Sequence, residues 1–257
     1  MFGGVIIYKS RDEMEIMDRC NRIVTRILGA LVHQVEPGVT TMDLDQTAET
    51  MCREAGVRPA FKGYRGYPCV LCASVNDEVI HGIPSARRVI REGDIIGLDF
   101  GVVLEGYYGD GAVTVPVGAV SGDATNLMRV TREALYLGVD AARPGNRLSD
   151  ISAAVQRHVE AAGYSVVRDF VGHGIGTALH EDPQVPNYGP AGNGPLLKEG
   201  LVLAIEPMVN MGSPGVRICD DGWTAKTLDG SLSAHFERSV AITSDGPWLL
   251  GGDAEVV

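Results

Sequence analysis

Two aspartates in the segment GLDFGVVLEGYYGDGAV, residues 97–113, lie where a β-hairpin would place core side chains. With the turn at 105–106, Asp99 and Asp110 become diagonal neighbours on one face of the hairpin, about 7–8 Å apart. The two carboxylates are then close enough to bind a small cation, or a pair of cations, between them. The expected cross-strand pairs are Asp99 with Ala112 and Gly101 with Asp110.

A later part of the chain repeats this arrangement with two glutamates. Glu206 ends the apolar strand LVLAIE, and Glu237 lies in the otherwise apolar strand AHFERSVAIT. Four carboxylates around one cavity repel each other unless they are protonated or neutralised, and two divalent cations would cancel their four charges. The alternative is that some of these acids face solvent on the open side of a sheet. Their matched positions favour the shared cavity.

Histidines in two glycine-containing segments could complete such a site. His173 has a glycine on each side in FVGHGIGTALHEDPQVP, His180 follows seven residues later, and His81 precedes a glycine in NDEVIHGIP. A single histidine often has only a structural role, but two in one Gly-rich segment favour a ligand or substrate contact. Carboxylates combined with imidazole favour Mn, Fe, Co or Zn.

An internal repeat at an offset of 107 residues positions these side chains. REGDIIGLDFG (91–101) matches KEGLVLAIEPM (198–208), and the segment 36–56 matches 143–163 at the same offset. Because the offset is constant, we expect two pseudo-symmetric halves, about 9–115 and 116–245, within one domain of residues 1–257. The alternative is an accidental likeness of two helix-turn-helix segments.

Each half has the same predicted order of elements. Helices are expected at about 11–34 and 122–141, each followed by a Pro-Gly turn. Second helices begin near Thr41 and Ser149, and the glycines at 56 and 163 end them. Strands and a hairpin around the carboxylates follow. The sequence therefore predicts an α+β fold whose two sheets join at the site.

Composition excludes several classes of function. The chain has 257 residues, 45% of them hydrophobic, and a formal net charge of −11, so no basic face offers itself to nucleic acid. No secretion signal and no run of eighteen apolar residues is present, so no membrane span is expected. An odd number of cysteines, five, favours a reducing compartment and hence the cytoplasm. Cys69 and Cys72 form one C-x-x-C, which could be a redox or zinc motif or two ordinary thiols.

Over about residues 9–245 the chain resembles a known family, on the motifs GYRGYP, NDEVIHGIP, GHGIG, HEDPQVP, IEPM, DGWTAKT and SLSAHFE and the Asp99 and Asp110 pair. It is similar to the type I methionine aminopeptidases, members of the pita-bread-fold metallopeptidases. The resemblance implies a curved antiparallel sheet with helices on its outer face, and two divalent metal ions (Co, Mn, Fe or Zn). The implied metal ligands are Asp99, Asp110, His173, Glu206 and Glu237, with Asp110 and Glu237 bridging.

The same resemblance implies the catalytic and substrate-binding groups. It implies that His81 and His180 contact substrate, and the chemistry of a metal-activated water adds that Glu206 accepts a proton from the attacking water while it ligates metal. We hypothesise that His180 stabilises the tetrahedral intermediate and that His81 assists the departing nitrogen. The implied methionine pocket consists of Phe61, Tyr64, Tyr67, Cys72, Leu179 and Trp223. Phe61 is bulkier than the residue often found there, and Leu179 replaces an aromatic residue.

The expected activity is removal of the initiator methionine from nascent polypeptides whose second residue is small. Thirty-two residues separate His173 from Glu206, too few for the helical insert of type II members, and no zinc-finger extension precedes the repeat. We expect a monomer in transient association with the ribosome. The alternatives are a proline-directed peptidase, which usually carries an additional N-terminal domain, and a binding protein that has lost its metal.

Overall fold

Four α-helices occur in residues 5–252, the part of the chain that the computed structural model describes. They are α1 (Arg11–Gln34), α2 (Thr41–Ala55), α3 (Gly122–Ala141) and α4 (Leu148–Ala161), and a short 3-10 helix spans Tyr64–Gly66. The predicted helices over 11–34 and 122–141 are confirmed, and α4 begins one residue before the predicted Ser149. Among these residues no helix is long and apolar enough to cross a membrane.

Three sheets complete the described structure, and the largest has nine strands in residues 5–252. Its strands run β1-β4-β5-β14-β9-β7-β8, with β2 on β4 and β15 on β14. Their bounds are β1 (Arg58–Pro59), β2 (Leu71–Val75), β4 (Ile95–Leu104), β5 (Tyr107–Pro116), β7 (Gly172–Gly174), β8 (Glu181–Val185), β9 (Val202–Ile205), β14 (Glu237–Thr243) and β15 (Gly246–Leu249). The smaller sheets contain β13 (Ser233–His235), β10 (Met208–Asn210) and β6 (Ser165–Val166), and β11 (Val216–Ile218), β12 (Ala225–Thr227) and β3 (Glu78–Ile80).

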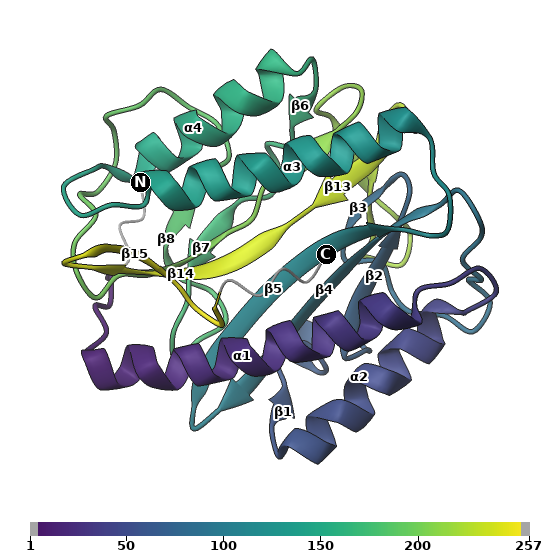
Figure 1. Ribbon diagram of the computed structural model, residues 1–257, viewed down its shortest axis with the longest axis horizontal. Helices are drawn as coiled ribbons and strands as arrows, with labels where there is room; N and C mark the ends of the chain where they lie inside the picture. The colour runs from purple at the N-terminus through teal and green to yellow at the C-terminus, as the bar shows by residue number, and fades with distance from the viewer. Residues whose placement is uncertain (1–4, 253–257) are drawn as a thin grey trace.

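The helices cover the sheet in two pairs. In Figure 1, α1 and α2 lie beside β1, β2, β4 and β5, and α3 and α4 lie beside the strands of the second half. The main core lies between helices and sheet and includes Ile27, Leu31, Phe100, Leu127 and Ile205. The predicted α+β fold is therefore confirmed.

Helix α1 is built to lie against the hairpin that carries Asp110. Ser10 caps its N-terminus in a capping box with Glu13, and its buried residues recur at three- and four-residue spacing. A Cβ on Gly109 would lie 3.1 Å from the backbone of Cys20, so glycine allows the close approach of strand and helix. Asn21 then accepts a hydrogen bond from the Asp110 N–H at 3.3 Å, which fixes the strand beneath the carboxylate.

Backbone hydrogen bonds recur at the 107-residue offset found in the sequence. Asp43 and Asp150, at matching positions of α2 and α4, each accept the backbone N–H of the N-cap residue, at 2.9 and 2.7 Å. Three further backbone hydrogen bonds of the first half, each from an N–H donor to a carbonyl acceptor, have a counterpart in the second half. Thr41 to Arg88 matches Leu148 to Pro195, Ile90 to Val39 matches Leu197 to Asn146, and Val57 to Cys52 matches Tyr164 to Val159. The two halves therefore share one local structure, and Asp99 in β4 is equivalent to Glu206, which directly follows β9.

The first hairpin has the predicted register, and the second pair of strands departs from a strict repeat. Asp99 pairs with Ala112 and Gly101 with Asp110, as expected. In the second half, Ile205 pairs with Arg238 and Met208 with His235, which sets Glu206 opposite Glu237. Glu237 therefore corresponds to Ala112, and Asp110 corresponds to His235. The expectation that Glu237 repeats the position of Asp110 is wrong, because the acids are diagonal in one half and directly opposed in the other.

Candidate metal centre

A cavity of about 280 Å³ lies where the two halves meet, and the predicted metal ligands, His81, His180 and the predicted methionine-pocket residues all line it. The four carboxylates, His173 and His180 come from β4, β5, β14, the segment after β9 and the segment 172–180, and His81 directly follows β3. The lining residues are Phe61, Tyr64, Arg65, Tyr67, Cys72, His81, Asp99, Asp110, Phe170, His173, Leu179, His180, Glu206, Trp223 and Glu237.

Four carboxylates meet in this cavity in a setting that opposes their ionisation. Burial, with the neighbouring Asp110 charge, raises the pKa of Asp99 and of Glu237 well above the usual range, and burial raises that of Asp110 to about 7. The pKa of Glu206 is raised in the same way by burial and by Asp99. Within residues 5–252, Asp99 Oδ1 and Glu237 Oε1 are buried without a hydrogen-bond partner. When these four acids are ionised, the site therefore holds more negative charge than the protein's own hydrogen-bond donors can compensate.

The imidazole of His173 directs a lone pair into the same space. Its Nδ1 donates to the carbonyl of Gly174 at 2.9 Å, which leaves Nε2 as an acceptor. Burial lowers the pKa of His173 to about 3, so the ring is neutral. Nε2 lies 3.5 Å from Glu206 Oε1 and 3.9 Å from Asp110 Oδ2. An acceptor nitrogen that faces two carboxylate oxygens is an arrangement that a cation between them would stabilise.

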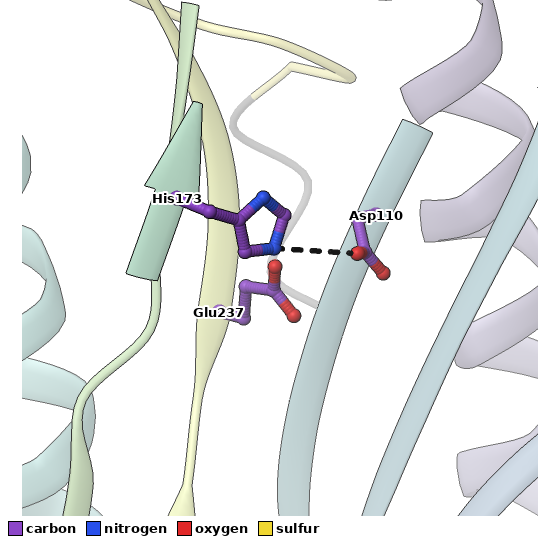
Figure 2. Close-up of side chains that lie close together, drawn as sticks. All are labelled: Asp110, His173 and Glu237. Atoms are coloured by element: carbon purple, nitrogen blue, oxygen red, sulfur yellow. Dashed lines mark ion pairs between the residues drawn. The ribbon is translucent and has the colours of Figure 1, made fainter. Parts of the chain in front are cut away.

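Three of the five predicted ligands are already gathered. Figure 2 shows the side chains of Asp110, His173 and Glu237, from β5, β7 and β14, pointing toward one another, and their ligand atoms lie within 4.8 Å of one another. Asp99 and Glu206 line the same cavity outside this tight group. The donor set of carboxylates with one imidazole, together with the unpartnered oxygens, fits divalent cations such as Mn, Fe, Co or Zn.

Glycine next to His173 is what lets β7 lie close to its neighbours. A Cβ on Gly172 would come within 2.4 Å of the Ala204 carbonyl oxygen on β9. His173 itself pairs with Ala204 across the same strands. Because backbone atoms leave no room for a side chain, Gly172 fixes the depth at which the imidazole enters the cavity.

Two further histidines face the cavity beside this cluster. His180 Nδ1 lies 2.8 Å from the hydroxyl of Tyr64, and the His180 ring is centred 4.3 Å from that of His173. His81 has a positive φ of 60° and makes edge contacts with the rings of Phe170 and Trp223. Burial and the charge of His180 lower the pKa of His81 to about 4, and burial also lowers that of His180. Both rings are therefore neutral near pH 7 and able to donate or accept one hydrogen bond at each nitrogen.

One wall of the cavity is apolar. Phe61, Tyr67, Cys72 and Leu179 are buried, and Trp223 packs edge-on against Tyr67 with ring centroids 5.0 Å apart. Tyr67 satisfies its hydroxyl by donating to backbone carbonyls of Leu71 and Gly82. The wall thus presents rings, a methyl-bearing side chain and sulfur, with no free charge.

The C-x-x-C motif contributes to packing in this structure. Cys69 and Cys72 are both buried and both free, and burial raises the pKa of each thiol. A raised thiol pKa opposes the thiolate that metal binding or disulfide exchange requires. Cys72 is the member of the pair that lines the cavity.

Three residues at or behind the cavity had no role assigned from sequence: Arg65, Phe170 and His235. Arg65 lies in the GYRGYP motif with a φ of 49°, and Phe170 precedes the Gly-rich segment. His235 is buried, and burial together with His81 lowers its pKa to about 3. Because side chains two residues apart in a strand share a face, the spacing of His235 from Glu237 could have indicated it.

Comparisons with known proteins agree with this geometry. The model of metallopeptidase family M24 matches residues 15–244. A protein of Clostridium acetobutylicum named methionine aminopeptidase is 51% identical over 246 residues, which cover 96% of this chain and 98% of that protein. The crystal structure of methionine aminopeptidase from Thermotoga maritima superimposes with a TM-score of 0.95 at 44% identity, covering 97% of this chain and 100% of that one.

A more distant neighbour shows how widely the fold is shared. The prolidase from Pyrococcus horikoshii matches with a TM-score of 0.79 at 22% identity, over 98% of this chain and 65% of its own. At that identity the match concerns the fold alone, which is the pita-bread fold expected from the sequence. Because the family model spans most of the chain and a full-length relative is about half identical, this chain belongs to metallopeptidase family M24.

Proposed function

We propose that this chain is a metal-dependent methionine aminopeptidase, which hydrolytically removes the N-terminal methionine of a nascent protein when the second residue is small. The observation that carries the proposal is one cavity in which buried carboxylates and an imidazole adjoin an apolar wall. High identity along nearly the full length of a relative named methionine aminopeptidase supports it.

Two divalent cations per chain are part of the proposal, and their number rests on charge. Four buried carboxylates carry four negative charges when ionised, which two divalent ions balance. The residues that would hold them are Asp99, Asp110, His173, Glu206 and Glu237, with Asp110 and Glu237 shared. Bound divalent cations act as Lewis acids and lower the pKa of water toward about 7. Ligand type alone admits Mn, Fe, Co or Zn.

The apolar wall is suited to a methionine side chain. A flexible thioether gains favourable contacts from aromatic rings and sulfur, which Tyr67, Cys72 and Trp223 supply. Phe61 and Leu179 are buried in the same wall and set its width. Tyr64 reaches the cavity beside His180.

The chain's own groups move and hold protons during hydrolysis. Glu206 accepts the proton of the attacking water, since its carboxylate lies in the cavity with Oε1 3.5 Å from His173 Nε2. The Tyr64 hydroxyl lies 2.8 Å from His180 Nδ1. With this hydroxyl as the donor, the ring proton of His180 is on Nε2, where it can stabilise the oxyanion of the tetrahedral intermediate. His81, which is neutral and lies edge-on to Trp223, assists the departing nitrogen.

The cellular setting completes the proposal. The whole chain, residues 1–257, acts as one catalytic domain and as a monomer, in the cytoplasm. Its substrates are nascent polypeptides beginning with Met, which it meets in transient association with the ribosome. It binds neither nucleic acid nor a membrane surface, because the net charge of −11 disfavours anionic partners.

Hydrolysis of two peptides with and without metal tests this function. We expect the EDTA-treated protein to cleave Met-Ala-Ser only after Mn²⁺ is restored, and to leave an Xaa-Pro peptide largely intact. Asp110→Ala should remain at the activity of the EDTA-treated protein, while the exposed control Asp140→Ala should match wild type. Preferred cleavage of the Xaa-Pro peptide would identify a proline-directed peptidase instead. Failure to bind Mn²⁺ or cleave either peptide would identify a binding protein.

A further inference from the structure

His235 is a buried imidazole that the proposed reaction does not use. It ends β13 at 4% exposure, two residues before Glu237, and it does not line the cavity. Within residues 5–252, the buried side-chain atoms without a hydrogen-bond partner are Asp99 Oδ1, Glu237 Oε1 and His235 Nε2. The two carboxylate oxygens belong to residues that would hold the proposed cations. The nitrogen of His235 needs a separate explanation.

The nearest acidic group to this nitrogen is the carboxylate of Glu206. His235 Nε2 lies 3.6 Å from Glu206 Oε2, and the other oxygen, Oε1, lies 3.5 Å from His173 Nε2. The carboxylate is therefore held between two imidazoles, one in the cavity and one behind it. A normal N–H···O hydrogen bond is about 2.9 Å long. The distance from His235 Nε2 to Glu206 Oε2 in this structure is therefore several tenths of an ångström longer than a hydrogen bond.

The backbone of His235 is held firmly, so Glu206 is the partner that can adjust. The N–H of His235 donates to Thr114 Oγ1 at 2.9 Å, and its carbonyl accepts from the same hydroxyl at 2.8 Å. It also pairs with Met208 across the small sheet. A fixed donor can hold a flexible carboxylate in one orientation.

We propose that His235 is a positioning residue of the metal centre: its Nε2–H donates to Glu206 Oε2 and thereby keeps Glu206 Oε1 directed at His173 and the bound cations. The inference rests on the proposed function only in taking Glu206 as a ligand. A proton on Nε2 is the arrangement that the geometry favours, because a lone pair there would face a carboxylate oxygen. A purely space-filling role would leave the orientation of Glu206 unchanged when the ring is replaced.

The symmetry of the fold supports this role. His235 occupies the register position that Asp110 occupies in the first half. Asp110 points into the cavity, whereas His235 lies behind Glu206. Equivalent backbone positions thus contribute to the proposed metal centre in both halves. Asp110 would act as a ligand, and His235 would orient the ligand Glu206.

Three substitutions separate positioning from packing. In His235→Gln the amide nitrogen lies near the place of Nε2 and retains a donor, in His235→Asn it lies near Nδ1, and in His235→Leu no donor is left. We expect Leu and Asn to weaken Mn²⁺ binding to EDTA-treated protein, measured by calorimetry, about 10- to 100-fold. Gln should stay within about threefold of wild type and should retain kcat on Met-Ala-Ser. Equal Mn²⁺ affinity in all variants, or Gln as weak as Leu, would overturn the proposal.

A measurement on the unsubstituted protein keeps the test decisive if a variant does not fold. Nitrogen-15 NMR of histidine-labelled, Mg²⁺-loaded protein reports which ring nitrogen of His235 carries the proton. The proposal requires Nε2–H, and a proton on Nδ1 with a bare Nε2 would overturn it. Both measurements can be separated from a failure of the proposed function. If wild type binds Mn²⁺ but leaves Met-Ala-Ser intact, the proposed activity is refuted, while the Mn²⁺ affinities of the His235 variants still decide the role of His235.

Discussion

Replacing Lys9 by Met should destabilise the protein and impair catalysis together, because Lys9 holds the segment that carries His180. Its ammonium forms an ion pair with Glu181, and the two side chains are only 3% and 5% exposed. Lys9 Nζ also donates to the Ile7 carbonyl at 3.0 Å, and Glu181 Oε1 accepts the N–H of Ala178 at 3.2 Å. The segment 178–181 is thus tied to the entry of α1.

The exposure of the pair sets the expected magnitude. Removing one partner of a buried ion pair leaves the other charge uncompensated and costs about 3–5 kcal/mol, whereas an exposed pair contributes about 0–1 kcal/mol. Lys9→Met should therefore lower the free energy of unfolding by about 3–5 kcal/mol. The matched control is Lys62→Met, which breaks the Lys62–Glu49 pair of 49% and 46% exposure and should cost under about 1 kcal/mol.

Urea unfolding of EDTA-treated protein measures these costs, and hydrolysis of Met-Ala-Ser at saturating Mn²⁺ measures the effect on the site. We expect Lys9→Met to lower kcat more than it raises KM, since His180 acts on the transition state. The double variant Lys9→Met with Glu181→Gln should recover part of the lost stability, because no buried charge is left unpaired. A cost for Lys9→Met as small as that for Lys62→Met would refute the reasoning.

Three other predictions test the site. Burial raises the pKa of Asp110 to about 7 from the ordinary 3.8, and it also raises the pKa of Asp99, Glu206 and Glu237, so the folded metal-free protein holds protons that the unfolded chain has released. Its free energy of unfolding should therefore fall as pH rises from about 4 to 7; urea midpoints of EDTA-treated protein should show this fall, and Asp110→Asn should make it smaller. Gly172→Ala should cost about 1–3 kcal/mol and weaken Mn²⁺ binding in calorimetry, while Gly29→Ala, in open space on α1, should stabilise slightly; equal effects would contradict the packing argument. His81→Ala and His180→Ala should each lower kcat at least about 100-fold with metal content unchanged by elemental analysis, and a parallel loss of metal would refute their separate roles.

The sequence predicted the local geometry of the site well, because that geometry depends on short-range pattern. The turn at 105–106 and the alternation of buried residues sufficed to give the pairing of Asp99 with Ala112, which the structure confirms. The helix predicted over 11–34 is confirmed, and Gly56 caps α2 as predicted. These features are decided by residues close together in the chain.

What the sequence did not predict depends on contacts between distant segments. His235 meets Glu206 only because β13 pairs with β10 and Glu237 falls directly opposite Glu206. The repeat suggested that Glu237 would match Asp110, but strand pairing shifted the equivalence to His235. The tie between Lys9 and Glu181 joins residues 172 positions apart, and no periodicity indicates such a partner.

The most direct test of the metal centre is an anomalous difference map, measured near the manganese edge, from crystals of this protein grown with Mn²⁺. We predict two adjacent peaks between Asp99, Asp110, His173, Glu206 and Glu237, with Asp110 and Glu237 touching both. A map with no peak in the cavity, or with these side chains turned away from the ions, would contradict the account.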